Sequence, residues 1–350
     1  MQVSRINQRM KILVTGGAGY IGSHTTLGLL QAGFDVVVLD NLCNALAESL
    51  CRVAQLAGRT PVFVEGDIRD RPLLDKLLAQ HPVQAVLHFA GLKSVGESVA
   101  HPLRYYDNNL GGTLTLCQAM EAAGVFTLVF SSSATVYGDP AIVPITEDQP
   151  AGHSTNPYGR SKFMVEQLLG DLTASDPRWR VALLRYFNPV GAHESGLIGE
   201  DPHGIPNNLL PYITQVAVGK LPELAVFGND YPTIDGTGVR DYIHVVDLAQ
   251  GHLAALKALQ TRTGTHVWNL GTGKGYSVLQ IIQAFEAASG KSIPYRIVPR
   301  RPGDIAACYA DPIKAATELG WSANRDLFTM MSDSWRWQMT NPDGYRMGKA

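Results

Sequence analysis

The sequence predicts an α/β fold in which helices cover both faces of a parallel sheet, followed by a smaller C-terminal α/β lobe. Short apolar runs recur along the first half of the 350-residue chain, and long intervening stretches leave room for crossover helices. Runs that no polar residue interrupts indicate strands buried on both faces. The six runs are Ile12–Val14, Val36–Leu39, Val62–Val64, Ala85–Phe89, Leu128–Phe130 and Val181–Leu184.

Small or polar residues follow each predicted strand, where parallel strands would open onto one shared crevice. After about residue 190 this pattern loosens and prolines become frequent, so we place a second lobe from Asn188 that returns in part to the sheet. The predicted units are residues 10–187 and residues 188–350. The residues at the strand ends are Thr15–Gly17, Asp40, Asp67, Gly91, Ser131–Ser133 and Asn188.

Composition limits the classes of function. Hydrophobic residues make up 45% of the chain, which supports a large core. The 29 basic and 31 acidic residues leave a net charge of -2, which removes the electrostatic case for nucleic acid or an anionic membrane. The four cysteines show no zinc-like spacing, and we find neither a secretory signal nor an apolar run long enough to cross a bilayer. We therefore expect a cytoplasmic protein with a small-molecule substrate and no metal.

The segment TGGAGYIG after the first strand predicts a nucleotide loop. Its glycines, among them Gly16, Gly19 and Gly22, allow close backbone approach to a pyrophosphate, and the helix that follows adds partial positive charge. Asp40 ends the second strand, where a carboxylate accepts hydrogen bonds from ribose hydroxyls and repels a 2′-phosphate. This favours NAD over NADP in a Rossmann-type sheet, against the alternative of a tight turn beside an ordinary surface aspartate. Asp67 could reach the adenine amino group or cap a helix.

The chemistry is predicted to lie on Tyr158, Lys162 and Ser133. Tyr158 and Lys162 are four residues apart in a helix that begins at Pro157, so they share one face. A nearby ammonium, together with a positive nicotinamide ring, would lower the tyrosine pKa and make it a general base for a hydroxyl group. Ser133 can hydrogen-bond the same hydroxyl and relay its proton. The opposite side of the helix is expected to be buried through Phe163, Met164, Leu168, Leu169 and Leu172.

Several segments together resemble the UDP-glucose 4-epimerases of the extended short-chain dehydrogenase/reductase superfamily. The likeness covers about residues 10 to 345, and residues 1–9 form an extension or tag remnant outside it. The segments that carry it are TGGAGYIGSH, FAGLKSVGES, YYDNNLGGT, SSSATVYG, NPYGRSK, LLRYFNPVGAH, GIPNNLLPYI and VRDYIHVVDLA.

The resemblance implies reversible epimerisation of UDP-glucose and UDP-galactose at C4 through a 4-keto sugar, with NAD bound throughout. Tyr158 takes the proton of the 4-hydroxyl while hydride leaves C4, and the sugar turns over before hydride returns to its other face. A homodimer is also implied, joined through helices around residues 100–123 and 158–172. The implied cofactor residues are Gly16, Gly19, Tyr20, Ile21, Gly22, Asp40, Asn41, Asn44, Asp67, Ile68, Phe89, Ala90, Gly91, Lys93, Asn108, Ser131, Tyr158, Lys162 and Tyr186.

The same resemblance implies a UDP-sugar site whose residues come mostly from the second lobe. Its arginines suit a diphosphate because a guanidinium fork matches the phosphate oxygens, although each taken singly could form a surface salt bridge. Asp304 would accept hydrogen bonds from the uridine ribose. The implied substrate residues are Lys93, Ser133, Thr135, Tyr158, Asn188, Asn208, Leu209, Ala225, Phe227, Arg240, Arg301, Asp304 and Cys308.

Three alternatives share the fold. Nucleotide-sugar 4,6-dehydratases carry acidic residues directly after the fifth-strand serines, whereas Ser133-Ala134-Thr135-Val136 has none, and the same absence weakens a UDP-glucuronate decarboxylase. A non-catalytic NAD-sensing module predicts the loss of Tyr158 or Lys162, and both are present.

His244 is interpreted as a structural histidine, since Tyr158 and Ser133 already fill the acid/base role.

Cys308 stands where many bacterial relatives carry a bulky tyrosine beside the sugar 2-position. A cysteine is far smaller, so the sequence predicts a wider pocket that also admits UDP-GlcNAc and UDP-GalNAc. The alternative is that Cys308 is a small packing residue and that backbone shifts close the gap.

Overall fold

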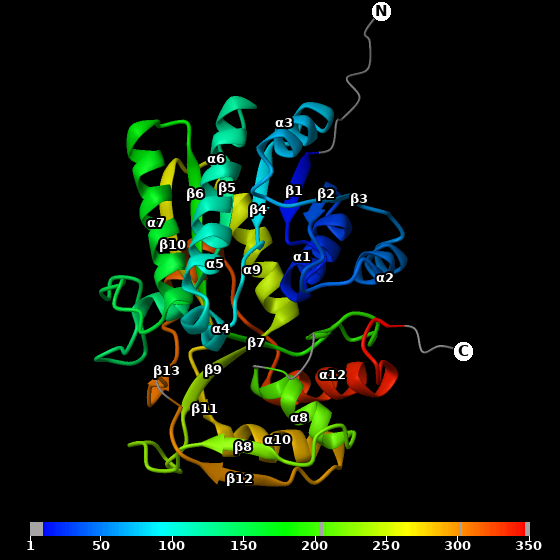
Figure 1. The fold of residues 1–350 in the computed structure, drawn as a ribbon, viewed down its shortest axis with the longest axis vertical. Helices are drawn as coiled ribbons and strands as arrows, with labels where there is room; N and C mark the ends of the chain where they lie inside the picture. Colours follow the sequence, from blue (N-terminus) through cyan, green and yellow to red (C-terminus); the bar gives the residue numbers. More distant parts are fainter. Residues whose placement is uncertain (1–9, 203–205, 207, 302, 347–350) are drawn as a thin grey trace, which may run out of the picture.

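The computed structural model describes residues 10–202, 206, 208–301 and 303–346; the predicted N-terminal extension, 1–9, lies outside them. A large lobe built on a parallel sheet adjoins a smaller lobe formed by later parts of the chain (Figure 1). The large sheet has seven strands in the order β10-β6-β5-β4-β1-β2-β3, and every neighbouring pair is parallel. The predicted fold class is therefore confirmed.

Each of the six predicted apolar runs falls on a strand of this sheet. The seventh strand, β10, comes from the second half of the chain and pairs with β6. Burial on both faces was wrong for β3, because it is the edge strand and Val62 is 44% exposed. The strands are β1 (Lys11–Thr15), β2 (Asp35–Asp40), β3 (Val62–Glu65), β4 (Ala85–His88), β5 (Thr127–Ser133), β6 (Arg180–Tyr186) and β10 (Gly264–Leu270).

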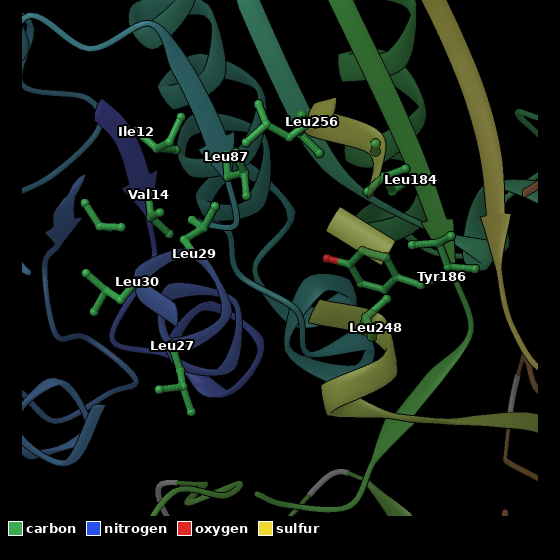
Figure 2. Packing of buried hydrophobic residues seen from close by; sticks show 14 of the residues in the cluster. Ile12, Val14, Leu27, Leu29, Leu30, Leu87, Leu184, Tyr186, Leu248 and Leu256 are labelled. Atoms are coloured by element: carbon green, nitrogen blue, oxygen red, sulfur yellow. The ribbon is translucent and has the colours of Figure 1, made fainter. Parts of the chain in front are cut away.

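Two hydrophobic cores lie on the two faces of the sheet, since successive side chains of a strand point to opposite sides. Figure 2 shows one of them, where Leu29 of α1 (Tyr20–Gln31) and Leu256 of α9 (Val245–Ala258) pack with strand residues. Helix α2 (Glu48–Ala57) belongs to this face. The other core lies under α3 (Arg71–Gln80), α6 (Gly112–Ala122) and α7 (Pro157–Ser175).

Short helical segments follow β4 and β5 at the end of the sheet that carries the predicted site. After β4 come α4 (Val95–Ala100), α5 (Pro102–Tyr105) and a π-helical turn (Tyr106–Gly111), and a 3₁₀ turn (Ala134–Tyr137) follows β5. These segments position loops over the carboxyl ends of the strands.

The smaller lobe is built around β9 (Val239–His244), which pairs with three short strands and leads directly into α9. No helix among the described residues is long and apolar enough to cross a membrane. The partners of β9 are β7 (Asn188–Val190), β11 (Gly275–Ser277) and β13 (Ala307–Cys308); β8 (Leu224–Phe227) pairs with β12 (Tyr295–Val298), and the helices are α8 (Leu209–Ala217), α10 (Val278–Ser289), α11 (Ile313–Leu319) and α12 (Leu327–Thr340).

Candidate active site

A cavity opens where the carboxyl ends of β1 to β6 meet the first turn of α1. It brings together all the predicted cofactor residues except Asp67. Residues at the carboxyl ends of six strands, β1 to β6, therefore converge on a single crevice, as expected for an open parallel sheet.

The glycine loop forms the floor of this cavity and leaves no room for side chains at two positions. A Cβ on Gly16, whose φ is +70°, would lie 2.6 Å from the Ala90 nitrogen, and one on Gly22 would lie 2.2 Å from the Gly16 oxygen. Helix α1 begins at Tyr20 with Gly19 as its N-cap and without a capping side chain. Its first turn therefore offers backbone N–H groups and the positive end of the helix dipole to an anion.

Asp40 ends β2 beside this loop and is buried. Its carboxylate accepts hydrogen bonds from the backbone N–H groups of Ala18, at 3.0 Å, and Leu42, at 2.9 Å. Burial raises its pKa, and these backbone hydrogen bonds oppose the rise. A carboxylate has further acceptor sites, so Asp40 can also take hydrogen bonds from ribose hydroxyls.

Asp67 lies outside the cavity lining, although Gly66 and Ile68 on either side of it are part of the lining. Its carboxylate accepts from Arg69 Nη2 at 2.8 Å and from Asn41 Nδ2 at 3.0 Å. Hydrogen bonds from Arg69 hold its pKa well below the usual range. Asp70 caps α3 instead, and a role for Asp67 at the cofactor stays a prediction.

Tyr158 and Lys162 lie in the first turns of α7 and line the cavity beside the nucleotide loop. Pro157 occupies the first turn, and Asn156 caps the helix by accepting from the Gly159 N–H at 3.0 Å. The Lys162 ammonium donates to the Ser131 carbonyl at 2.6 Å and lies 4.7 Å from the centre of the Phe130 ring. Burial lowers the pKa of Lys162 to about 8, and the Glu166 charge opposes this.

The pKa of Tyr158 is raised in this structure, whereas the sequence predicts a lowered pKa beside Lys162 and a positive nicotinamide ring. Burial raises the pKa of Tyr158, and a hydrogen bond with Ser133 is the interaction that opposes the rise. The ammonium is engaged by the Ser131 carbonyl, and burial penalises the phenolate. A lower pKa of Tyr158 therefore depends on positive charge in addition to the Lys162 ammonium. The sequence predicts that the nicotinamide ring is that second charge.

The side of α7 that packs on the sheet differs from the prediction. Its buried stripe includes Lys162, Val165, Glu166 and Leu169, whereas Met164 is 40% exposed. A helix that covers a sheet buries the row of side chains that faces the sheet. On α7 this row includes Lys162, which therefore points toward the cavity. Of the five predicted core residues on α7, only Leu169 is fully buried.

Sequence reasoning missed a buried ion pair below the catalytic residues. Arg185 Nη2 lies 2.6 Å from Glu166 Oε2, and Glu166 Oε1 accepts from the Ser132 hydroxyl at 2.5 Å. The pair ties α7 to β5 and β6 next to Lys162. An acidic residue four positions after a lysine is common on helices, so its spacing carried no signal.

The π-helical turn at Tyr106–Gly111 was also missed. It presents Asn108 to the cavity and buries Asn109. Asn109 Oδ1 accepts from the Leu92 N–H at 2.8 Å, and its amide donates to the Leu92 carbonyl and the Ser161 hydroxyl, both at 3.0 Å. Asn109 thus fixes the loop after β4 against α7. Single-turn π-helical bulges frequently occur at functional sites.

Lys93, Ser133, Thr135 and Tyr158 belong to the larger lobe, and the other predicted UDP-sugar residues form a second group on the smaller lobe. Cys308 on β13 pairs with Arg240 on β9, and Arg240 Nη2 lies 3.9 Å from Asp304 Oδ1. The Arg301 guanidinium lies 4.3 Å from the centre of the Phe227 ring. Asn188 begins β7, the other parallel neighbour of β9; Leu209 begins α8, and Ala225 lies on β8.

Cys308 links this group to the catalytic strand. It is buried in a small cluster with Ala134 and Phe187, which are the neighbours of Ser133 and Asn188 in the chain. The Thr135 hydroxyl donates to Ser133 Oγ at 3.0 Å. The four cysteines are free thiols.

Glu200 joins the two groups and carried no signal in the sequence. Its Oε1 lies 3.0 Å from Lys93 Nζ and accepts from Asn208 Nδ2 at 2.8 Å. Glu200 belongs to a loop of the second lobe. The strand-end prediction covers only residues that directly follow the apolar strands of the first lobe, so it does not include this loop. The other cavity residues that sequence reasoning missed are Ala18, Leu39, Cys43, Ala45, Leu46, Gly66, Leu92, Gly199, Asp201, Pro202 and Tyr345.

His244 lies outside the cavity lining and is fully buried. Its Nδ1 accepts from the Val246 N–H at 3.1 Å, so Nε2 carries the hydrogen that faces Asp333 Oδ2 at 3.2 Å. These contacts are those of a structural histidine.

A model of the NAD dependent epimerase/dehydratase family matches residues 12–271. UDP-glucose 4-epimerase of Pasteurella multocida is 64% identical over 96% of this chain and 100% of that protein, and UDP-glucose 4-epimerase of Bacillus subtilis is 63% identical over 96% and 99%. This chain belongs to the UDP-glucose 4-epimerases. The resemblance inferred from the sequence is thereby confirmed.

A solved structure extends the likeness to the whole fold. UDP-glucose 4-epimerase from Bifidobacterium longum, in complex with NAD+ and UDP, superposes with a TM-score of 0.94 at 56% identity and covers 96% of this chain and 100% of that one. NAD is the cofactor of the family.

Proposed function

We propose that this enzyme interconverts UDP-glucose and UDP-galactose by inverting the sugar at C4 while NAD stays bound. The observation that carries the proposal is the convergence of Tyr158 and Lys162 on the cavity that the glycine loop and Asp40 also line. NAD would be held by the glycine loop, Asp40 and Lys162, and when bound it would supply hydride uptake from C4 and hydride return. The protein supplies proton transfer, orientation and a fixed nucleotide site.

The cavity fits NAD at both of its ends. At one end, the glycine loop and the open first turn of α1 suit the pyrophosphate, and the Asp40 carboxylate suits an unphosphorylated ribose. At the other end, Lys162 and Tyr158 lie where hydride chemistry needs a cation and a proton acceptor. These placements support the cofactor roles predicted from the sequence.

Tyr158 is proposed as the acid/base residue for the 4-hydroxyl, with Ser133 as its hydrogen-bonded relay. The phenol keeps its proton in the protein alone because burial raises its pKa. A positive charge beside the phenol would lower that pKa, so we expect proton removal to depend on cofactor occupancy. Lys162, with a pKa of about 8, can hold positive charge at neutral pH.

UDP is proposed to bind the smaller lobe through Arg240 and Arg301, with Asp304 at the uridine ribose. Arg301 and Asp304 are exposed, and Arg240 lies 3.9 Å from Asp304, so the three side chains can be reached by a diphosphate and its ribose. The sugar itself must be held weakly enough to turn over between hydride removal and return. The small Cys308 side chain at this end supports a pocket that also accepts the 2-acetamido sugars.

We further propose a cytoplasmic homodimer. Val99 on α4, Leu103 on α5, Leu114 on α6 and Met164 on α7 are 62%, 81%, 43% and 40% exposed, and these elements form one region of the larger lobe (Figure 1). Four free thiols favour a reducing compartment. Light scattering should give twice the chain mass for the protein and one chain mass for Leu103→Asp; a monomeric parent protein would refute the dimer.

Proton NMR of the purified protein with UDP-galactose, without added NAD, tests the function. We expect the anomeric signal of UDP-glucose to appear until a constant ratio is reached. No reaction of UDP-galactose, even with NAD supplied, would overturn the sugar assignment. Release of a 4-keto-6-deoxy sugar would instead indicate a dehydratase.

A further inference from the structure

The end of the chain reaches back to the cofactor cavity through Trp337, Asn341 and Tyr345, which we call the C-terminal clamp. We propose that this clamp retains NAD by holding the loop 196–201 as a wall of the cavity. The inference rests on the cofactor site of the proposed function and assigns a positioning role to residues far from the chemistry.

The clamp fastens the loop mainly through its backbone. The Tyr345 hydroxyl accepts from the Gly199 N–H at 3.1 Å and donates to the Gly199 carbonyl at 3.2 Å. Trp337 Nε1 donates to the Glu200 carbonyl at 3.1 Å, and the Tyr345 N–H donates to Asp201 Oδ2 at 2.9 Å. Three consecutive loop residues are therefore fixed by two aromatic residues of the chain end.

The clamp packs tightly against the loop. A Cβ on Gly199 would lie 2.4 Å from the Trp337 ring, so the indole packs directly on the loop backbone. Trp337 and Tyr345 are 5% and 6% exposed, and their ring centres are 4.8 Å apart. Both belong to the same hydrophobic core as α1 and the central strands.

Arg52 on α2 secures the clamp from the side of the larger lobe. Its Nη1 donates to Asn341 Oδ1 at 2.5 Å and to the Leu197 carbonyl at 3.1 Å, and its guanidinium lies 5.1 Å from the Tyr345 ring centre. Asn341 Nδ2 donates to the Gly196 carbonyl at 2.8 Å. The loop is thus held between a helix of the nucleotide-binding lobe and the chain end.

The loop bears on the cofactor because Gly199, Glu200 and Asp201 line the cavity together with Tyr345. Glu200 also carries the contact to Lys93, a predicted cofactor residue, and to Asn208, a predicted UDP residue. Tyr20, in the first turn of α1, lines the same cavity as Glu200 and Tyr345. Releasing the clamp would loosen this wall and open a route for NAD to leave.

The experiment compares NAD retention in Tyr345→Phe, Tyr345→Ala and Trp337→Phe with a matched control, Tyr231→Phe. Tyr231 has a buried hydroxyl without a hydrogen-bond partner among the described residues, so its removal costs no such bond. The NAD content per chain is measured after acid release, and NAD loss is followed during dialysis, with thermal unfolding recorded in parallel.

We expect roughly tenfold faster NAD loss for Tyr345→Phe, which forfeits two hydrogen bonds, and roughly 100-fold for Tyr345→Ala. Added NAD should restore turnover, because the catalytic residues are intact, and Tyr231→Phe should match the parent protein. If Tyr345→Ala does not fold, Tyr345→Phe and Trp337→Phe carry the test.

The clamp would be refuted if the folded variants lost NAD at the same rate as the parent protein. It would also be refuted if Tyr231→Phe lost NAD as fast as the clamp variants. A lower unfolding temperature with unchanged NAD loss would likewise leave the clamp only a structural role and overturn the proposal. A parent protein that neither contains nor takes up NAD would refute the proposed function as well, so the two failures are distinguishable.

Discussion

The cofactor side and the UDP side of the site are built in different ways. On the cofactor side, backbone groups, glycines and buried side chains form the walls, as in the Gly16 turn and the Asn109 bridge. On the UDP side, the candidate ligands include exposed side chains such as Arg301 and Asp304 on short strands and loops. The first arrangement is fixed by close backbone packing and buried hydrogen bonds, whereas the second presents exposed side chains.

This difference suits the two ligands that the reaction needs. Because the cofactor must survive many turnovers, a rigid and buried site reduces the ordering cost of binding it. A UDP-sugar must enter, let its sugar turn, and leave, so flexible charged side chains that hold the diphosphate are sufficient. We expect substitutions on the two sides to separate cofactor retention from substrate affinity.

The largest effect should come from Tyr158→Phe, which removes the proposed acid/base hydroxyl. We expect the turnover rate to fall by about 10³, within the range for general acid/base groups, which is a larger effect than any change in NAD content or UDP affinity. Steady-state kinetics and acid release of NAD would check this, with Tyr231→Phe as control. Near-normal turnover would exclude Tyr158 as the proton acceptor.

Buried histidines on the cofactor side should make the folded protein sensitive to acid. Burial lowers the pKa of His24 and His88 to about 3 and that of His252 to about 4. Their folded-state pKa values lie below the unfolded value of about 6.5, so the unfolded chain binds protons first and stability falls as the pH drops below 6.5.

Each of these histidines should remove up to about 1.4 kcal/mol of unfolding free energy per pH unit between its two pKa values. Urea titrations from pH 6.5 to 4.5 measure this slope, and His252→Gln should make it shallower. A slope that His252→Gln leaves unchanged would show that His252 is not buried in its neutral form.

On the UDP side, Arg240→Ala should weaken UDP binding roughly tenfold through loss of a charge-assisted contact, and Arg240→Lys should recover only part of it. NAD content should not change. Calorimetric titration with UDP gives the affinity of each variant. Release of NAD from Arg240→Ala would break the separation between the two sides.

The smallest and most selective effect is expected from Cys308→Tyr. A bulky ring at this position should reduce turnover of UDP-GalNAc several-fold or more and leave UDP-galactose within about twofold, since only the 2-acetamido group needs the space. Equal rates for both sugars in parent and variant would show that Cys308 is only a packing residue.

The cofactor side was predictable from the sequence because its signals are local. Gly16 and Asp40 follow apolar strands directly, and Tyr158 and Lys162 share one helix, so each residue is placed by its own neighbours. The direction in which α7 packs was predicted wrongly, because apolar residues such as Met164 occur on both of its sides. Apolar spacing alone could not identify the stripe that faces the sheet.

The remaining features depend on contacts between distant parts of the chain. Glu200 and Tyr345 reach the cavity only through the folding of the second lobe and the chain end onto the first. Asn109 takes its position from a π-helical turn that has no distinct sequence pattern. Residues of this kind are recognised from the structure, since neither spacing nor residue type distinguishes them from ordinary surface groups.

Turnover of UDP-galactose in D₂O, with no NAD added, tests the central claim most directly. If a retained cofactor carries the C4 hydrogen away and back, the UDP-glucose formed keeps its C4 proton in the NMR spectrum, while the hydroxyl proton handled by Tyr158 exchanges unseen. Deuterium at C4 of the product would mean that this hydrogen leaves as a proton, and it would contradict hydride transfer within a closed NAD site.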